Sequence, residues 1–150
     1  MKITIETHVP APADLVWRAF NTPEDILRWD ASDAWRTVWA ANDLRVGGLL
    51  RLRIEGEGDG MDFTARYLRV EPFRLLEWRQ EEDGRIVRVD LIATETGTEL
   101  HQTFDAVSPD RQTEERADWQ AVLDRFARYA GERYGAKDGL GARILSKPAS

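Results

Sequence analysis

The first residues of the chain alternate between apolar and polar side chains. Ile3, Ile5 and Val9 fall on one side of an extended segment, and His8 falls on the other. Because successive side chains of a strand point to opposite faces, this period of two predicts a half-buried strand at the N-terminus and places His8 in solvent.

Beyond the first strand, the spacing of apolar residues changes to three and four. Pro12 suits the first turn of a helix, because it lacks the N–H that would be left unbonded there, and Trp17 and Phe20 follow at helical intervals. The pair Thr22-Pro23 marks a second start, with a capping residue before the proline and acidic residues behind it. The sequence therefore predicts two short helices in series.

From Thr37 onward, short alternating segments are separated by turn signals. The signals are Gly47-Gly48, Glu57-Gly58-Asp59-Gly60, Asp83-Gly84 and Thr96-Gly97. One face of the intervening segments is apolar and carries Leu50, Leu52, Ile54, Leu76, Trp78, Val87, Val89, Leu91, Leu100, Gln102 and Phe104. The opposite face is polar and includes Arg51 and His101. This pattern predicts an antiparallel sheet whose apolar face another element must cover.

The covering element is a helix near the C-terminus, which Ser108-Pro109 would open. Its apolar residues recur at intervals of three and four: Trp119, Val122, Leu123, Phe126, Ala130 and Tyr134. The prediction is an α+β fold, a curved antiparallel sheet of about six to seven strands wrapped around a long C-terminal helix. We expect a single domain over residues 1–134 and a flexible tail over 135–150, whose apolar Leu140 to Leu145 segment could join two copies in a homodimer.

Three blocks of sequence carry a family resemblance. They are the segment from Val9 to Trp17, the segment Trp35-Arg36-Thr37-Val38-Trp39-Ala40-Ala41-Asn42-Asp43-Leu44-Arg45-Val46-Gly47-Gly48, and the segment from Trp119 to Phe126. In this order they resemble the START-like, helix-grip superfamily (SRPBCC, which includes the birch-pollen allergen). Within it, the chain is similar to homologues of the Hsp90 ATPase activator.

The resemblance implies a space between sheet and helix that often holds an apolar ligand. It also exposes one departure, because the family usually has Gly before the tryptophan of the last helix and this chain has Asp118. We interpret the segment from Asn42 to Gly48 as a structural turn, since Asn-Asp and Gly-Gly pairs are turn formers.

Composition and charge exclude several classes of function. The net charge is −6 and the basic residues are dispersed, which argues against nucleic acid or an anionic membrane as partner. No apolar run approaches the roughly 20 residues of a membrane span, and the N-terminus lacks the apolar core of a secretory signal, so we expect a cytoplasmic protein. The absence of Cys excludes thiolate nucleophiles and cysteine metal sites.

The search for catalytic groups yields none that we would assign. His8 and His101 are both expected to face outward, and we predict no metal site and no cofactor. A calcium site at Glu55, Glu57, Asp59 and Asp62 is an alternative, but the spacing differs from that of an EF-hand.

A few polar residues could point toward the interior of the predicted fold. Gln102 lies between Leu100 and Phe104 and is therefore expected to point inward. Three further candidates for an inward direction depend on the strand register, which a one-residue bulge would reverse: Thr64, Arg66 and Glu77.

The six Trp residues are either core or the aromatic wall of a cavity. With the resemblance in view, we favour a cavity lined by Trp29, Trp35, Trp39, Leu52, Phe63, Tyr67, Trp78, Val89, Gln102, Phe104, Trp119, Leu123 and Phe126. The predicted function is binding, transport or sensing of a small apolar or aromatic molecule. The alternatives are an enzyme of the cyclase or hydratase type, which needs an inward titratable group, and a chaperone-linked interaction module.

Overall fold

The computed structural model describes residues 2–135. The elements in chain order are β1 (Lys2–Val9), α1 (Ala13–Asn21), α2 (Pro23–Trp29), β2 (Trp35–Asn42), β3 (Leu49–Gly56), β4 (Met61–Glu71), β5 (Leu75–Gln80), β6 (Ile86–Thr94), β7 (Gly97–Asp105), the 3₁₀ turn η1 (Pro109–Arg111) and α3 (Gln112–Tyr134). The predicted order of strand, two short helices, strands and long helix is confirmed.

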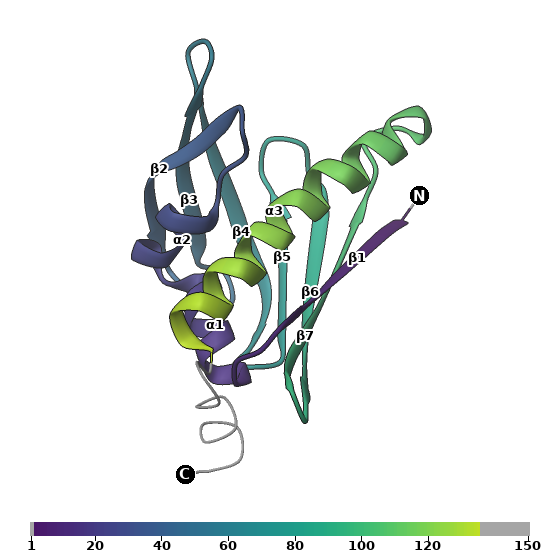
Figure 1. The fold of residues 1–150 in the computed structure, drawn as a ribbon. Helices are drawn as coiled ribbons and strands as arrows, with labels where there is room; N and C mark the ends of the chain where they lie inside the picture. Colours follow the sequence, from purple (N-terminus) through teal and green to yellow (C-terminus); the bar gives the residue numbers. More distant parts are fainter. Residues whose placement is uncertain (1, 136–150) are drawn as a thin grey trace.

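The strands form one antiparallel sheet of seven, in the order β1-β7-β6-β5-β4-β3-β2. The chain's first strand therefore lies beside its last one, and β2 forms the opposite edge. The sheet curls around α3, which crosses its concave face diagonally, while α1 and α2 lie at one end of the sheet (Figure 1). This is the predicted helix-grip architecture.

The helix starts differ from the sequence prediction in their detail. Pro12 is the residue before α1 and not its first turn, and Thr22 precedes Pro23 at the start of α2 without a side-chain capping bond. Ser108 opens only η1, and α3 begins at Gln112. Pro23 and Pro109 occupy the first turns of α2 and η1, where the fixed φ of proline suits a helix.

Close packing of α3 is confined to one part of the sheet. The helix approaches β1 closely, and it contacts α1 and α2, but it makes no comparably close approach to β3, β4 or β5. Beneath its closely packed part, Ile3, Val87, Leu100 and Phe126 are completely buried. This is the predicted apolar face, covered as expected.

A bulge in β2 overturns one expectation. The register of β2 against β3 shifts between Thr37 and Trp39, so Val38 is an extra residue in the strand. An extra residue reverses the alternation beyond it. Thr37 is buried, whereas Trp39 is half exposed on the outer face. The prediction that Trp39 faces the interior is therefore wrong.

The turn from Asn42 to Gly48 holds β4 in place. The N–H of Gly47 donates to the carbonyl of Tyr67 at 2.9 Å, and the N–H of Tyr67 donates to the carbonyl of Gly48 at 3.0 Å. A Cβ on Gly48 would lie 2.1 Å from the carbonyl oxygen of Asp43, so only glycine fits there. The structural interpretation of this turn is consistent with these bonds.

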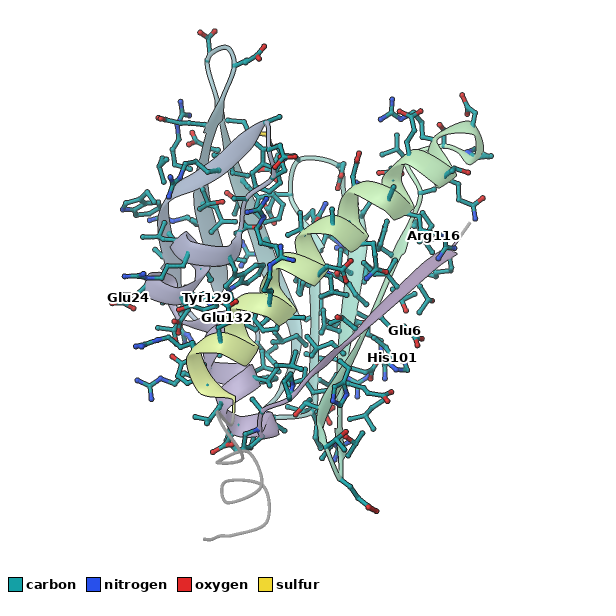
Figure 2. All side chains as sticks on the ribbon, in the orientation of Figure 1. Glu6, Glu24, His101, Arg116, Tyr129 and Glu132 are labelled. Carbon is teal, nitrogen blue, oxygen red and sulfur yellow. The ribbon has the colours of Figure 1, made fainter. Side chains whose placement is uncertain are left out.

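The outer face of the sheet carries the remaining polar candidates. His101 lies there next to Glu6 (Figure 2), 3.4 Å from a Glu99 oxygen. His8 also lies on this face, with its Nε2 3.3 Å from the Thr96 hydroxyl. Thr64, Arg66 and Glu77 occupy outer-face positions, opposite to Phe63, Ala65 and Trp78. The register therefore turns these three candidates outward. The irregularity in β4 lies between Tyr67 and Arg69, beyond Thr64 and Arg66.

The acidic hairpin between β3 and β4 is organised by an arginine. The Arg53 guanidinium lies 3.8 Å from Glu55 and 3.2 Å from Asp62, and it donates to the carbonyl of Asp59 at 2.8 Å. Within residues 2–135, no three His, Cys, Asp or Glu side chains are grouped as metal ligands. The positive charge at this hairpin is supplied by Arg53.

A buried carboxylate fixes α2 against the C-terminal part of α3. Asp25 accepts hydrogen bonds from the hydroxyls of Tyr129 (labelled in Figure 2) and Tyr134, the latter at 3.1 Å. Burial and the neighbouring carboxylate raise the pKa of Tyr129 to about 12, so it stays a hydrogen-bond donor at neutral pH. These hydrogen bonds fix the position of α2 relative to α3.

The end of α3 is closed by Gly135, whose N–H donates to the carbonyl of Gly131 at 2.9 Å. The rest of the expected tail and its segment from Leu140 to Leu145 lie outside the described residues, so the flexible tail and the homodimer stay predictions. Across residues 2–135, none of the helices combines the length and apolar character that a bilayer span requires.

Candidate functional site

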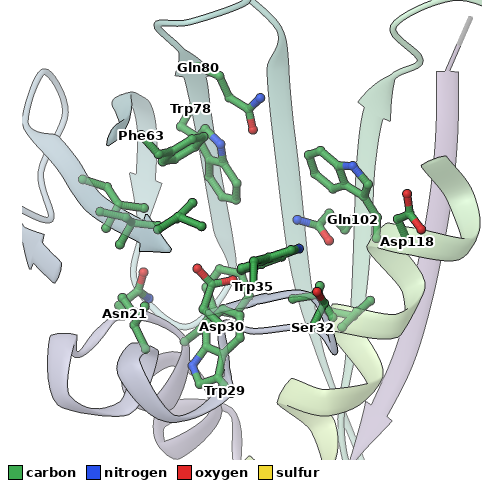
Figure 3. Close-up of a pocket in the computed structure, with 18 of the residues that line it drawn as sticks. Asn21, Trp29, Asp30, Ser32, Trp35, Phe63, Trp78, Gln80, Gln102 and Asp118 are labelled. Carbon is green, nitrogen blue, oxygen red and sulfur yellow. The ribbon is translucent and has the colours of Figure 1, made fainter. Parts of the chain in front are cut away.

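A cavity of about 620 Å³ lies between α3 and the part of the sheet formed by β2 to β5. Its walls come from the ends of α1 and α2, the four strands, β7 and the first half of α3 (Figure 3). The lining residues are Phe20, Asn21, Ile26, Trp29, Asp30, Ser32, Ala34, Trp35, Asn42, Leu50, Leu52, Ile54, Phe63, Tyr67, Trp78, Gln80, Gln102, Asp118, Trp119, Ala121, Val122 and Leu123.

Nine residues of the predicted lining stand in this wall: Trp29, Trp35, Leu52, Phe63, Tyr67, Trp78, Gln102, Trp119 and Leu123. Four others do not. Val89, Phe104 and Phe126 are completely buried in the core, and Trp39 is on the outer face. Sequence alternation identifies which side chains point inward. It does not distinguish a side chain buried in the core from one that borders the cavity, so the predicted lining contained both.

Two of the core residues support the aromatic wall from behind. The ring of Phe104 stacks on Trp119 with centroids 3.8 Å apart, and the ring of Phe126 meets Trp29 edge-on at 4.9 Å. The indole N–H of Trp29 donates to the carbonyl of Ala19 at 2.9 Å, which fixes that ring. Fixed rings present a preformed apolar surface to a ligand.

Gln102 is the polar residue that sequence alternation placed inside, and the structure agrees. Its side chain points from β7 into the cavity (Figure 3) and is only 8% exposed. Among the described residues it has no hydrogen-bond partner, although a buried amide normally has one. The amide is therefore free to bond to a molecule in the cavity.

A second set of polar residues forms a closed network in the wall. The Tyr67 hydroxyl donates to the Asn42 side-chain oxygen at 2.8 Å, and the Asn42 amide donates to the carbonyl of Asn21 at 2.8 Å. Burial raises the pKa of Tyr67 well above its ordinary value, so the phenol remains a neutral donor. These groups are already paired with each other, so they define shape more than they offer bonds.

Asp30 is a carboxyl of the cavity wall whose pKa is shifted from its ordinary value. It follows the last residue of α2, where the negative end of the helix disfavours a carboxylate. Its Oδ2 accepts a hydrogen bond from the Thr37 hydroxyl at 2.8 Å. Burial raises the pKa of Asp30 to about 6, and the bond from Thr37 opposes that shift. A carboxyl with a raised pKa in a pocket is a candidate for a functional group.

The sequence analysis missed Asn21, Asp30, Asn42 and Gln80. Gln80 could have been found, because it continues the alternation of Leu76 and Trp78. The others offered no periodic signal, since two lie at helix ends and Asn42 turns inward only because of the bulge in β2. Asp118, noted as a departure from the family pattern, lies at the edge of the cavity on α3.

The chain is similar to known proteins in sequence and fold. Residues 10–131 match the family described as Activator of Hsp90 ATPase homolog 1-like protein (AHSA1). The chain belongs to this family. The AHSA1-like protein from Aeromonas hydrophila, known from a solution NMR structure, is 37% identical, with a TM-score of 0.81 over 88% of this chain and 93% of that chain.

Two other solved structures extend the comparison. A protein from Cytophaga hutchinsonii is 30% identical, with a TM-score of 0.76 over 87% of this AHSA1-like chain and 92% of the other. A protein from Chromobacterium violaceum is 23% identical, with a TM-score of 0.76 over 87% and 98% of the two chains, and shows that the fold is shared. A search of the curated proteins finds no match to this chain.

Proposed function

We propose that this AHSA1-like protein binds a small apolar or aromatic molecule in the cavity, as a carrier or sensor. The observation that carries the proposal is a cavity of about 620 Å³ with mostly apolar walls and one buried, unpartnered amide, that of Gln102. Ligand pockets commonly enclose about 300–1,000 Å³ and combine apolar walls with a few placed polar groups. The membership in a helix-grip family agrees with this assignment.

The test uses the neutral fluorescent dye N-phenylnaphthylamine. We expect saturable binding of one dye molecule per chain, because the aromatic wall is preformed. Val122, which lines the cavity from α3, is changed to Trp to fill it, and exposed Val46 receives the same change as a control. Val122→Trp should weaken binding by about tenfold or more, and Val46→Trp should leave it unchanged.

Two results would count against the proposal. One is a fluorescence rise that does not saturate, which indicates nonspecific adsorption. The other is equal binding by both variants, which would place the dye outside the cavity.

Asp30 supports one second candidate, an enzyme that uses this carboxyl as a general acid or base. A pKa of about 6 is suited to proton transfer near neutral pH. Such an enzyme would consume a metabolite when incubated with a cell extract, as followed by mass spectrometry. Asp30→Asn should abolish that consumption and leave dye binding intact. A metabolite profile that is the same for both proteins would remove this candidate.

A further inference from the structure

The charges around the cavity are all of one sign. Its described lining contains two carboxylates, Asp30 and Asp118, and no Lys, Arg or His. The titratable groups that face the space are these two and the Tyr67 phenol, which stays neutral. An anionic molecule would therefore enter a site that repels it and offers no charged partner.

Two arginines near this wall are paired with carboxylates. The guanidinium of Arg85 lies 5.5 Å from the ring centroid of Trp119, but it bonds to Asp83 and Glu115, each at 2.9 Å. Arg125 lies 3.5 Å from Asp33, a neighbour of Asp30 that does not line the cavity. Neither arginine is available to receive a carboxylate or phosphate from a ligand.

Several polar oxygens that line the cavity lack a hydrogen bond among the described residues. Asp30 uses only Oδ2 for Thr37, Gln80 uses only its Nε2, toward Asp83, and Asn21 uses only its Nδ2, toward the carbonyl of Trp17. Among described partners, the second oxygen of each side chain makes no hydrogen bond. A ligand that donates hydrogen bonds would satisfy these oxygens. The indole N–H of Trp78 and the amide of Gln102 also lack a partner and remain for an acceptor elsewhere on the ligand.

The aromatic rings of the cavity wall also attract positively charged groups. Trp29, Trp35, Trp78 and Trp119 all contribute rings to this wall, and the face of a Trp ring attracts a cation. Trp119 already has Phe104 and Arg85 against its ring, whereas Trp35 contacts no other ring or arginine among the described residues. Carboxylates and ring faces together form the type of surface that binds a protonated nitrogen. They leave the rest of the cavity for an apolar body.

We infer that the ligand of this cavity is an amphipathic amine, whose protonated nitrogen bonds to Asp30 while its apolar or aromatic body lies against the tryptophans. The inference rests on the proposed function and specifies its ligand class. It also gives Asp30 a reason to remain a carboxylate in a position where burial and the end of α2 both disfavour one.

The experiment compares three probes with the same ring system: naphthylethylamine, naphthylethanol and naphthylacetate. Their dissociation constants are measured by calorimetry at neutral pH for the full chain and two variants. Asp30→Asn removes the charge with little change in shape. Glu24→Gln removes an equal charge from α2, at an exposed side chain that lies outside the cavity.

We expect the amine to bind about tenfold or more tightly than the acid, with the alcohol between them. Asp30→Asn should reduce this ratio to about threefold or less, and Glu24→Gln should preserve it. Equal affinities, tighter binding of the acid, or an amine preference that survives Asp30→Asn would overturn the inference while the proposed function stands. If none of the three probes binds, the proposed function fails and the inference fails with it.

Discussion

The two halves of the space beneath α3 are built from the same type of sequence but are filled differently. Where α3 packs on β1, side chains such as Ile3, Val89 and Phe126 are completely buried and leave no room. Where α3 passes over β3, β4 and β5 it stays farther away, and the gap is lined by tryptophans, amides and Asp30. One amphipathic helix can therefore complete a tightly packed core at one end and cover an open cavity at the other.

The largest effect should come from a matched pair of phenylalanines, one in each half. Phe126→Ala removes a fully buried ring and should lower the free energy of unfolding by about 3–5 kcal/mol. Phe63→Ala removes a partly exposed ring that borders the cavity, so we expect a loss of only about 1–2 kcal/mol. Urea denaturation measures both. Equal losses would show that the two halves are packed alike.

The next effect concerns the stability cost of Asp30 in the open half. The ordinary pKa of this carboxyl is 3.8 and in the folded protein it is about 6. The unfolded chain therefore releases its proton first, and the protein loses stability as the pH rises through this window. Above it, Asp30→Asn should be more stable than wild type by about 1–2 kcal/mol, after allowance for solvent screening.

Urea denaturation of both proteins at several pH values between about 4 and 8 checks this difference. The advantage of the variant should be absent at the acidic end and complete above pH 6. A variant less stable than wild type at neutral pH would mean that the charge of Asp30 stabilises the fold.

Ligand binding in the open half should depend on the same proton. An alkylamine keeps its charge across this range, as a Lys side chain does, with a pKa of about 10. Naphthylethylamine should bind more tightly as the pH rises from about 5 to neutral, by about threefold to tenfold, because Asp30 becomes charged. Calorimetry at both pH values measures the change, and naphthylethanol is the control. The same pH dependence in Asp30→Asn would assign it to another group.

The smallest effect should come from the tryptophan that the bulge turns outward. Trp39→Ala should change the free energy of unfolding by about 0.5 kcal/mol or less and leave dye binding unchanged, because its ring is half exposed. Trp35→Ala, in the same strand but before the bulge, removes part of the cavity wall and should weaken dye binding. Titration of both variants compares them, and a loss of binding in Trp39→Ala would contradict the register of β2.

The sequence by itself determined the order of elements and the face that each presents. Period-two segments, proline-started helices and glycine turns are local signals, so they predicted the sheet, the short helices and α3 without any contact between distant residues. They also placed Gln102 inside, because the alternation of β7 is unbroken between Leu100 and Phe104. Most of the aromatic wall followed from the same rule.

Only the tertiary structure decided which inward side chains face an open space. That division depends on the distance between α3 and each strand, which no local pattern encodes, and it separated Trp119 in the wall from Phe104 behind it. The bulge at Val38 sent Trp39 out and Asn42 in, and chain packing brought Asp30 from a helix end into the cavity. Periodicity specifies direction within an element, whereas depth and proximity arise only when the elements pack together.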